Sequence, residues 1–287
     1  MIKRGYILVW LTIFAVFFTH SALAQEKIKI GVVQFSDEGF YAEGLRGVLQ
    51  QLKKGGFNEN DIIIDIKNAE GRKDKVLEII KEFKGKGLNL IITIGTMPTI
   101  IAAEEIKDIP IVFSTVYDPI GSGIAKDWES SGNNTTGTST WVDFSSMVST
   151  IRRVSPGKKI GVIYTAGEKN SVIQLSEFNK LKDRFGYEVI SVNLDNPDDA
   201  KNVTEALVGR VDSFFITGST VVGKGLGKIL EVAKRAKIPT FAHLQERAEQ
   251  GVLIVVAANS FELGELAGKK ATQVLNGVHP VFIPIET

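Results

Sequence analysis

The chain has no cysteine, and histidine is scarce, with 3 among 287 residues. Without cysteine there is no disulfide, no thiolate nucleophile and no sulfur ligand for a metal ion. Only His243 and His279 lie beyond the first 24 residues, and neither belongs to a nucleophile motif or to a metal-ligand spacing. We therefore expect no enzyme activity, no catalytic residues, no metal site and no cofactor.

An excess of charge of one sign is lacking as well. The 34 lysines and arginines nearly balance 33 aspartates and glutamates, for a formal net charge of +1. Nucleic-acid binding normally needs a basic face or stripe, so we expect no nucleic-acid partner. Hydrophobic residues make up 44% of the chain, which indicates a globular protein, and the length suits two lobes better than one core.

The longest apolar run lies at the N-terminus. Lys3 and Arg4 precede an uncharged apolar run at 7–18, and Ala22-Leu23-Ala24 supplies a small-residue cleavage pattern. The run has about a dozen residues, whereas a membrane span needs about 20. The sequence therefore predicts a cleaved signal peptide, residues 1–24, and export to the periplasm without a lipid anchor, since no cysteine is available to carry one; an uncleaved anchor is the alternative.

Apolar runs and amphipathic segments then alternate twice. The first series predicts strands at 28–33, 62–66, 90–94 and 109–113 with helices between them. A polar, glycine-rich passage at 130–137 follows, which we interpret as a linker toward a hinge. The second series predicts strands at 159–164, 188–192, 213–217, 240–241 and 253–257. The fold class is α/β, with two Rossmann-like lobes of parallel sheets flanked by helices, a hinge and a cleft between the lobes.

The predicted lobe boundaries follow from this repetition. Lobe 1 covers residues 25–138, and the chain returns to it at about 252–278. Lobe 2 covers residues 139–251 together with about 279–287. This arrangement needs at least two crossings between the lobes, and the tail suggests a third.

Two neighbouring strands of the first lobe end in polar loops. The strand at 90–94 leads to Gly95-Thr96 with Pro98 at a helix start, and the strand at 109–113 leads to a loop containing Asp118. In an open parallel sheet, ligands bind outside the carboxyl ends of the strands. The loops are thus candidate binding loops, although ordinary turns, with Asp118 capping its own loop, explain the pattern equally well.

A glycine-rich segment in the second lobe imitates a phosphate-binding loop. Gly218 to Gly225 matches G-x-x-x-x-G-K between a predicted strand and helix, but Gly225 stands where a magnesium-binding serine or threonine is required. We interpret Gly218 to Thr220 instead as a turn that binds an anion or a polar ligand, the counterpart of Gly95-Thr96.

Several segments taken together carry a family resemblance. They are Ile109-Pro110-Ile111-Val112-Phe113, Asp118 to Gly123, Asn133 to Gly137, Val162-Ile163-Tyr164, Glu168 to Ser171, Lys237-Ile238-Pro239, Leu263-Gly264 and Leu275-Asn276-Gly277. In order and spacing the chain resembles the periplasmic substrate-binding components of ABC importers of the tryptophan/tyrosine-binding type. The resemblance covers nearly the whole chain after the signal peptide.

The resemblance implies a protein whose lobes close on a small ligand, often an aromatic or other amino acid, and which hands the ligand to a membrane permease powered by a cytoplasmic ATPase. Thr96 and the helix behind it would receive a carboxylate, and Asp118 an ammonium group. The ligand-facing positions that it implies are Gln34, Ser36, Thr96, Asp118, Asn170, Ser171, Ser219 and Thr220. We expect a monomer with a small-molecule ligand and an ABC permease as partners.

Two departures from the family pattern leave the ligand open. The first loop has Ser36 to Gly39 where the family commonly has His-Pro, and the second lobe has Gly218-Ser219 where it has Asp-Asn. Phe40, Tyr41, Tyr117 and Trp141 either wall an aromatic ligand or simply pack. The alternative function is a sensory protein that presents its ligand to a membrane receptor kinase.

Overall fold

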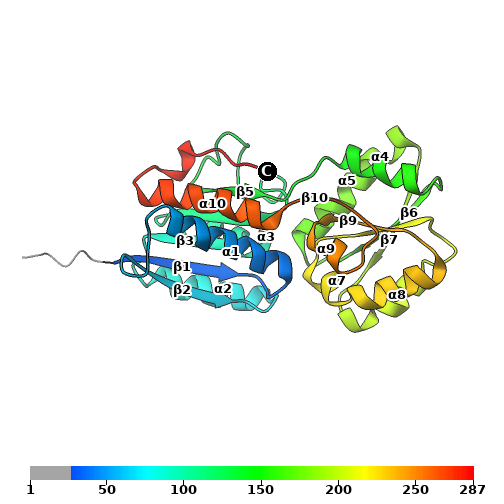
Figure 1. Ribbon diagram of the computed structural model, residues 1–287, viewed down its shortest axis with the longest axis horizontal. Helices are drawn as coiled ribbons and strands as arrows, with labels where there is room; N and C mark the ends of the chain where they lie inside the picture. The colour runs from blue at the N-terminus through cyan, green and yellow to red at the C-terminus, as the bar shows by residue number, and fades with distance from the viewer. Residues whose placement is uncertain (1–26) are drawn as a thin grey trace, which may run out of the picture.

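The computed structural model describes residues 27–287, and the predicted signal peptide lies outside them. These residues form two lobes, each built on one sheet of five parallel strands with helices on both faces (Figure 1). The predicted fold class is confirmed. No helix in the described part of the chain is both long and apolar enough to cross a bilayer.

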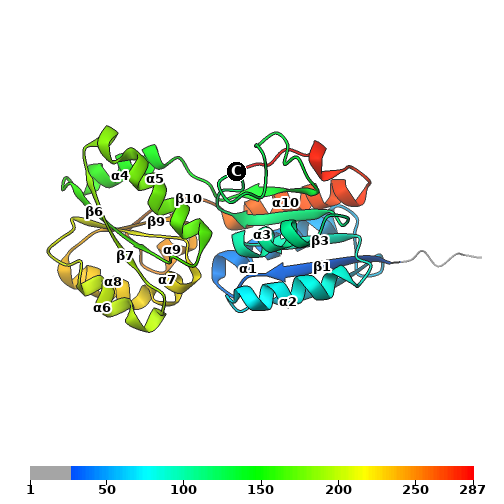
Figure 2. The ribbon, with the colours of Figure 1, turned by 180° about the vertical axis from the view of Figure 1, so that it is seen from behind.

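The first sheet has the strand order β2-β1-β3-β4-β5. Its strands are β1 (Ile28–Gln34), β2 (Ile62–Asn68), β3 (Leu90–Ile94), β4 (Ile111–Val116) and β5 (Thr135–Ser139). β3 and β4 are buried along their whole length, as parallel strands covered on both faces should be. The helices α1 (Gly39–Lys54) and α10 (Ser260–Leu275) cover one face, and α2 (Lys73–Lys84) and α3 (Thr96–Glu105) cover the other (Figures 1 and 2).

The second sheet has the strand order β10-β9-β8-β6-β7. Its strands are β6 (Lys159–Tyr164), β7 (Glu188–Asn193), β8 (Ser213–Ile216), β9 (Thr240–Leu244) and β10 (Ile254–Ala258). One face packs against α4 (Phe144–Val154) and α5 (Lys169–Phe185) through an aromatic core. The other packs against α6 (Ala200–Glu205), which follows the turn η1 (Pro197–Asp199), and against α7 (Thr220–Lys224) and α8 (Leu226–Ala236). The short α9 (Glu246–Glu249) follows β9.

The tail is divided between the lobes differently from the predicted boundaries. β10 pairs with β9 and so belongs to the second sheet, whereas residues from about 252 were assigned to lobe 1. Residues 279–287, assigned to lobe 2, lie against the first lobe after the turn η2 (Pro280–Phe282). There Glu286 forms a parallel bridge with Thr138, and Ser139 N–H donates to Glu286 O at 2.7 Å. The physical reason is that β5 is an edge strand whose backbone groups need a partner, and α10 ends beside it.

The polar passage predicted as a linker contains part of this edge strand. Thr135, Thr136 and Gly137 are buried in β5, and the Thr136 hydroxyl donates to the carbonyl of Ile283 at 2.8 Å. Within residues 27–287 the chain passes between the lobes twice, after β5 and after β10. The third crossing is not made, because the tail stays with the first lobe.

Candidate ligand-binding site between the lobes

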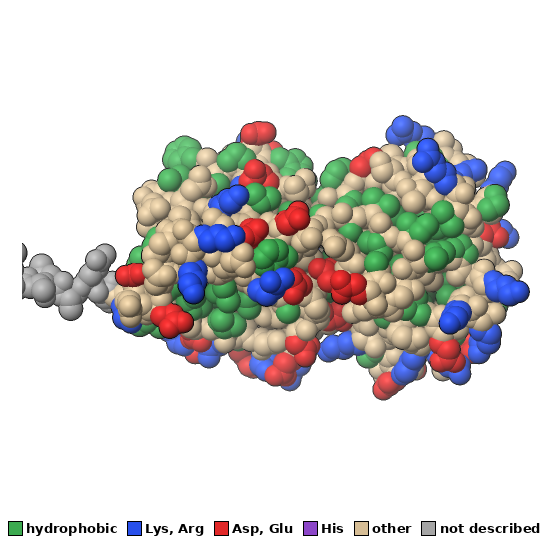
Figure 3. Space-filling view, in the orientation of Figure 1, with side chains coloured by type: hydrophobic (Ala, Val, Ile, Leu, Met, Phe, Trp, Pro, Cys, Tyr) green, Lys and Arg blue, Asp and Glu red, His purple; other side chains and the backbone are tan. Residues whose placement is uncertain are grey.

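The carboxyl ends of both sheets face the boundary between the lobes. β1 points toward the second lobe (Figure 1), and the lobes touch where α1 and α3 of the first meet α5 and α9 of the second. On the face shown in Figure 3, acidic side chains gather along this boundary. The predicted site residues all lie in or beside the loops that follow these strands.

In the first lobe, Thr96 opens α3 directly after Gly95, whose φ of 114° is open to glycine but strained for other residues. The Thr96 Oγ1 accepts a hydrogen bond from the Tyr117 N–H at 3.2 Å and is buried. No side chain caps this helix N-terminus. Its first N–H groups are therefore open to an anion, which the helix dipole also favours.

Gln34 and Ser36 lie together at the end of β1. The Gln34 side-chain amide donates to the Ser36 carbonyl at 2.6 Å, and the Ser36 Oγ accepts from the Glu38 N–H at 3.4 Å. Both side chains are buried. They shape the loop that leads into α1.

Asn170 and Ser171 lie together in the second lobe at the start of α5. The Asn170 side-chain amide donates to the Gly218 carbonyl at 2.7 Å. The Ser171 hydroxyl is 2.7 Å from that of Thr217 and accepts from the Thr165 N–H at 2.9 Å. These bonds join the loops after β6 and β8 into one polar surface.

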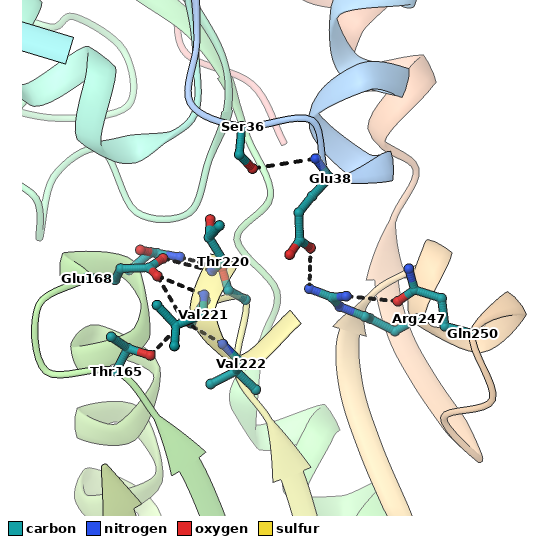
Figure 4. Close-up of polar contacts among 12 residues, drawn as sticks. Ser36, Glu38, Thr165, Glu168, Thr220, Val221, Val222, Arg247 and Gln250 are labelled. Carbon is teal, nitrogen blue, oxygen red and sulfur yellow. Dashed lines mark hydrogen bonds and ion pairs between the residues drawn. The ribbon is translucent and has the colours of Figure 1, made fainter. Parts of the chain in front are cut away.

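The turn at Ser219 and Thr220 is occupied by a carboxylate of the protein itself. Glu168 accepts from the Ser219 hydroxyl and the Thr220 N–H, each at 2.9 Å, and from the Val221 N–H at 3.2 Å (Figure 4). The sequence predicts that this turn binds an anion or a polar ligand; its N–H groups donate to the protein's own Glu168, and the polar-ligand role stays a prediction. Burial raises the pKa of Glu168, and the bonds from Thr220 and Val221 oppose that shift.

An ion pair joins the lobes beside this turn. The Glu38 Oε2, at the start of α1, is 2.8 Å from the Arg247 Nη2 on α9, and the side chains are 10% and 2% exposed (Figure 4). Burial raises the pKa of Glu38, and Arg247 opposes the shift. The Arg247 Nη1 donates to the Gln250 Oε1 at 2.8 Å, which orients the guanidinium.

A neutral histidine lies behind the boundary in the second lobe. The Gln174 Oε1 accepts from the Gly218 N–H at 2.9 Å, so the Gln174 amide nitrogen is the donor to the His243 Nε2 at 3.2 Å. The ring proton therefore sits on Nδ1, which is buried and has no hydrogen-bond partner within residues 27–287. The ring of Tyr117, from the first lobe, packs edge-on against it with centroids 5.3 Å apart. Burial lowers the pKa of His243 to about 3.

Asp118 follows Tyr117, whose N–H donates to Thr96, so it lies near the start of α3. Its Oδ1 accepts from the N–H groups of Ile120 and Gly121 at 3.0 and 2.8 Å, so it caps its own loop. It also lines a cavity of about 630 Å³ with Trp128 and Trp141. The sequence left the capping and ligand roles open, and the capping contacts are present.

Three residues at this boundary were missed as site residues from sequence. Glu38 and Glu168 lie in loops that follow predicted strands, which is a usable signal. Arg247 lies in a helix of four residues that has no periodic pattern. Among residues 27–287 no group of three or more His, Cys, Asp or Glu side chains is placed to hold a metal ion.

Comparisons with known proteins agree with this architecture. Residues 29–287 match the family described as ABC transporter substrate binding protein. The chain is 28% identical over 266 residues to the tyrosine-binding protein of Clostridioides difficile. The aligned region covers 92% of this chain and 77% of that protein.

Two solved structures are informative as a pair because both are 27% identical to the chain. The ABC domain from Streptococcus pneumonia in complex with L-Trp superposes with a TM-score of 0.85, covering 91% of this chain and 88% of that one. The ligand-free, open structure of a substrate-binding protein with adhesive properties from Clostridium difficile superposes with a TM-score of 0.68, covering 90% of this chain and 88% of that one. The lobes of this chain thus superpose better on the ligand-bound relative.

Proposed function

The chain belongs to the family of ABC transporter substrate-binding proteins, and from this premise we propose that it is the binding component of an ABC importer for an amino acid with an aromatic side chain. The ligand would bind between the lobes, and the closed protein would deliver it to a membrane permease. The polar groups at the boundary would bind and orient the ligand, with no part in catalysis.

Two relatives support the choice of ligand. One is named for binding tyrosine, and the other was solved with L-Trp. The aromatic residues Phe35, in the loop after β1, and Phe40 and Tyr41, at the start of α1, pack together beside Arg247, close to the boundary. Aromatic rings there suit an aromatic ligand because edge and face contacts add to the burial of apolar area.

The observation that carries the proposal is the burial of polar groups from both lobes at one boundary. Thr96 and the uncapped N-terminus of α3 lie on the first-lobe side, and the hydrogen-bonded loops around Ser171 and Ser219 lie on the second-lobe side. The N-terminus of α3 would bind the ligand carboxylate, because Glu168 already occupies the corresponding turn of the second lobe.

Asp118 would bind the ligand ammonium group through its second carboxylate oxygen, since Oδ1 is used by the loop. Gln34, Ser36, Asn170, Ser171, Ser219 and Thr220 would shape and line the two walls. We further propose that the protein is exported through its signal peptide, remains in the periplasm without a lipid anchor, and works as a monomer.

The experiment that tests this function is a thermal-shift screen of residues 25–287 against amino acids, nucleobases, sugars and small organic acids. A ligand present at 100 times its dissociation constant should stabilise the protein by about 2.7 kcal/mol, which raises the melting temperature measurably. We expect stabilisation by L-tryptophan or L-tyrosine, and loss of that stabilisation in Thr96→Val. Stabilisation by sugars alone would exclude the proposed ligand class.

A further inference from the structure

The Glu38–Arg247 pair differs from the other ion pairs formed within residues 27–287. It is the one pair in that part of the chain whose members come from different lobes, and both of its side chains are at least nine-tenths buried. The others join residues of one lobe and have at least one member more than one-fifth exposed; examples are Lys54–Glu265 and Lys228–Asp198. An exposed pair contributes little, whereas a buried pair depends strongly on both partners being present.

Each partner is held in place from its own lobe. The Glu38 N–H donates to the Ser36 Oγ at the entrance to α1, and Gln250 orients the guanidinium of Arg247 from the end of α9. Across the boundary, the Arg247 Cζ also lies 5.6 Å from the centre of the Phe40 ring of the first lobe. The pair is therefore assembled from two preformed halves, one on each lobe (Figure 4).

The topology makes this contact sensitive to the arrangement of the lobes. The chain crosses between the lobes after β5 and after β10, whereas Glu38 follows β1, which β3 and β4 separate from β5 in the sheet. The crossing after β10 leads into α10, which packs against α1, so the chain keeps α1 near the second lobe, but the contact between Glu38 and Arg247 is itself not covalent. Separation of the lobes would break the pair and return both charges to water.

A second close approach lies further along the same boundary. A Cβ atom placed on Gly71, in the loop after β2, would lie 3.2 Å from the Thr220 Cγ2 of the second lobe. The contact thus extends from β1 toward the outer edge of the first sheet, with the ion pair between that edge and the crossings.

We propose that Glu38 and Arg247 form a latch that holds the lobes closed and sets how long a bound ligand is retained. Retention of a ligand rests on the proposed function, whereas closure of the lobes rests on the geometry of the pair alone. A buried ion pair need not favour closure over an apolar pair of similar size, but one buried charge without its partner opposes closure strongly. The latch should therefore tolerate loss of both charges better than loss of one.

Four variants test the latch by different means. Glu38→Gln and Arg247→Met each remove one charge, and the double variant E38Q/R247M removes both. Gly223→Ala leaves both charges in place but introduces a Cβ that would overlap the Arg247 guanidinium and the Glu38 carboxylate. The matched controls are Gly227→Ala, whose Cβ would meet no atom within 4 Å, and Asp198→Asn, which breaks the exposed pair with Lys228.

The measurement is the rate at which L-tryptophan dissociates, followed in stopped flow by chase with excess competitor. We expect L-tryptophan to dissociate from E38Q, R247M and G223A at least about tenfold faster than from the wild type. From E38Q/R247M its dissociation rate should be within about threefold of the wild-type rate. G227A and D198N should match the wild type. The latch would be overturned if the single variants released L-tryptophan at the wild-type rate. It would also be overturned if the fold-increase in rate for the double variant equalled the product of the fold-increases for the two single variants.

Small-angle scattering without any ligand separates failure of the latch from failure of the proposed function. We expect ligand-free E38Q and R247M to have a larger radius of gyration than the ligand-free wild type and the double variant, at equal helix content by circular dichroism. If L-tryptophan binds to none of the proteins, this comparison still decides the latch. Equal radii for all variants would reject it.

Discussion

At the scale of single residues, the buried imidazole of His243 predicts a pH dependence of stability. Its pKa is about 3 in the folded protein, against an ordinary value of 6.5, because burial disfavours the charged ring. Below pH 6.5 the unfolded chain therefore takes up a proton that the folded chain does not. Stability contributed by the neutral ring is complete above pH 6.5 and falls by roughly 1.4 kcal/mol per pH unit below it, down to about pH 3.

The measurement is urea unfolding at pH 7.0, 6.0 and 5.0 for the wild type and for His243→Gln. We expect the variant to be less stable at pH 7 but to lose less stability on acidification than the wild type. His279→Gln, which changes an exposed ring, is the control and should follow the wild type. Parallel pH curves for H243Q and the wild type would contradict the assignment.

Asp118 allows its two possible roles to be separated by a single isosteric change. Asp118→Asn keeps an oxygen that can accept from the Ile120 and Gly121 N–H groups but removes the negative charge. We expect the dissociation constant for L-tryptophan, measured by calorimetry, to rise roughly 10- to 100-fold, as for loss of one charge-assisted hydrogen bond, with little change in melting temperature.

Asp127, which caps the neighbouring loop by accepting from the Ser130 N–H at 2.7 Å, provides the matched control. Asp127→Asn should leave both the affinity and the melting temperature near their wild-type values. An unchanged affinity in D118N would leave Asp118 as a loop cap only.

At the scale of elements, the packing of α1 against α10 depends on glycine. A Cβ on Gly264 would overlap the carbonyl oxygen of Gly44, and a Cβ on Gly47 would overlap that of Phe261. The helix backbones therefore approach more closely than side chains would permit. Gly264→Ala should reduce the free energy of unfolding by about 1–3 kcal/mol, since overpacking forces the helices apart.

Equilibrium unfolding in urea checks this prediction. Gly227→Ala, a glycine-to-alanine change on an exposed face of α8, should stay within about 0.5 kcal/mol of the wild type. A G264A variant as stable as G227A would show that the helices can move apart without loss.

At the scale of the whole molecule, the arrangement that superposes better on the L-Trp complex than on the open relative is the one that a ligand should favour further over any open population. We expect saturating L-tryptophan to reduce the radius of gyration in small-angle scattering, because contacts to both lobes favour the closed arrangement. A sugar without effect on the melting temperature is the control. An unchanged scattering profile with bound L-tryptophan would contradict ligand-driven closure.

Local patterns in the chain were enough to predict the α/β architecture, the two parallel sheets and the family. Apolar runs of β-strand length such as Leu90–Ile94, and amphipathic segments such as Lys73–Lys84, carry their structure in neighbouring residues, so sequence spacing reveals them. The loops that follow the strands could be located for the same reason, since carboxyl ends of parallel strands share one edge.

Contacts between distant parts of the chain were decided only by the tertiary structure. Glu38 and Arg247 are 209 positions apart, and Glu168 reaches the turn at Thr220 across 52 positions. The threonine-rich β5 becomes a strand because it pairs with β4, and the tail bridges its outer edge, which no local pattern predicts. The sequence by itself thus determined which elements form and where the binding loops lie. Only the packing of the lobes decided which charges meet, because burial and pairing involve residues that are far apart in the sequence.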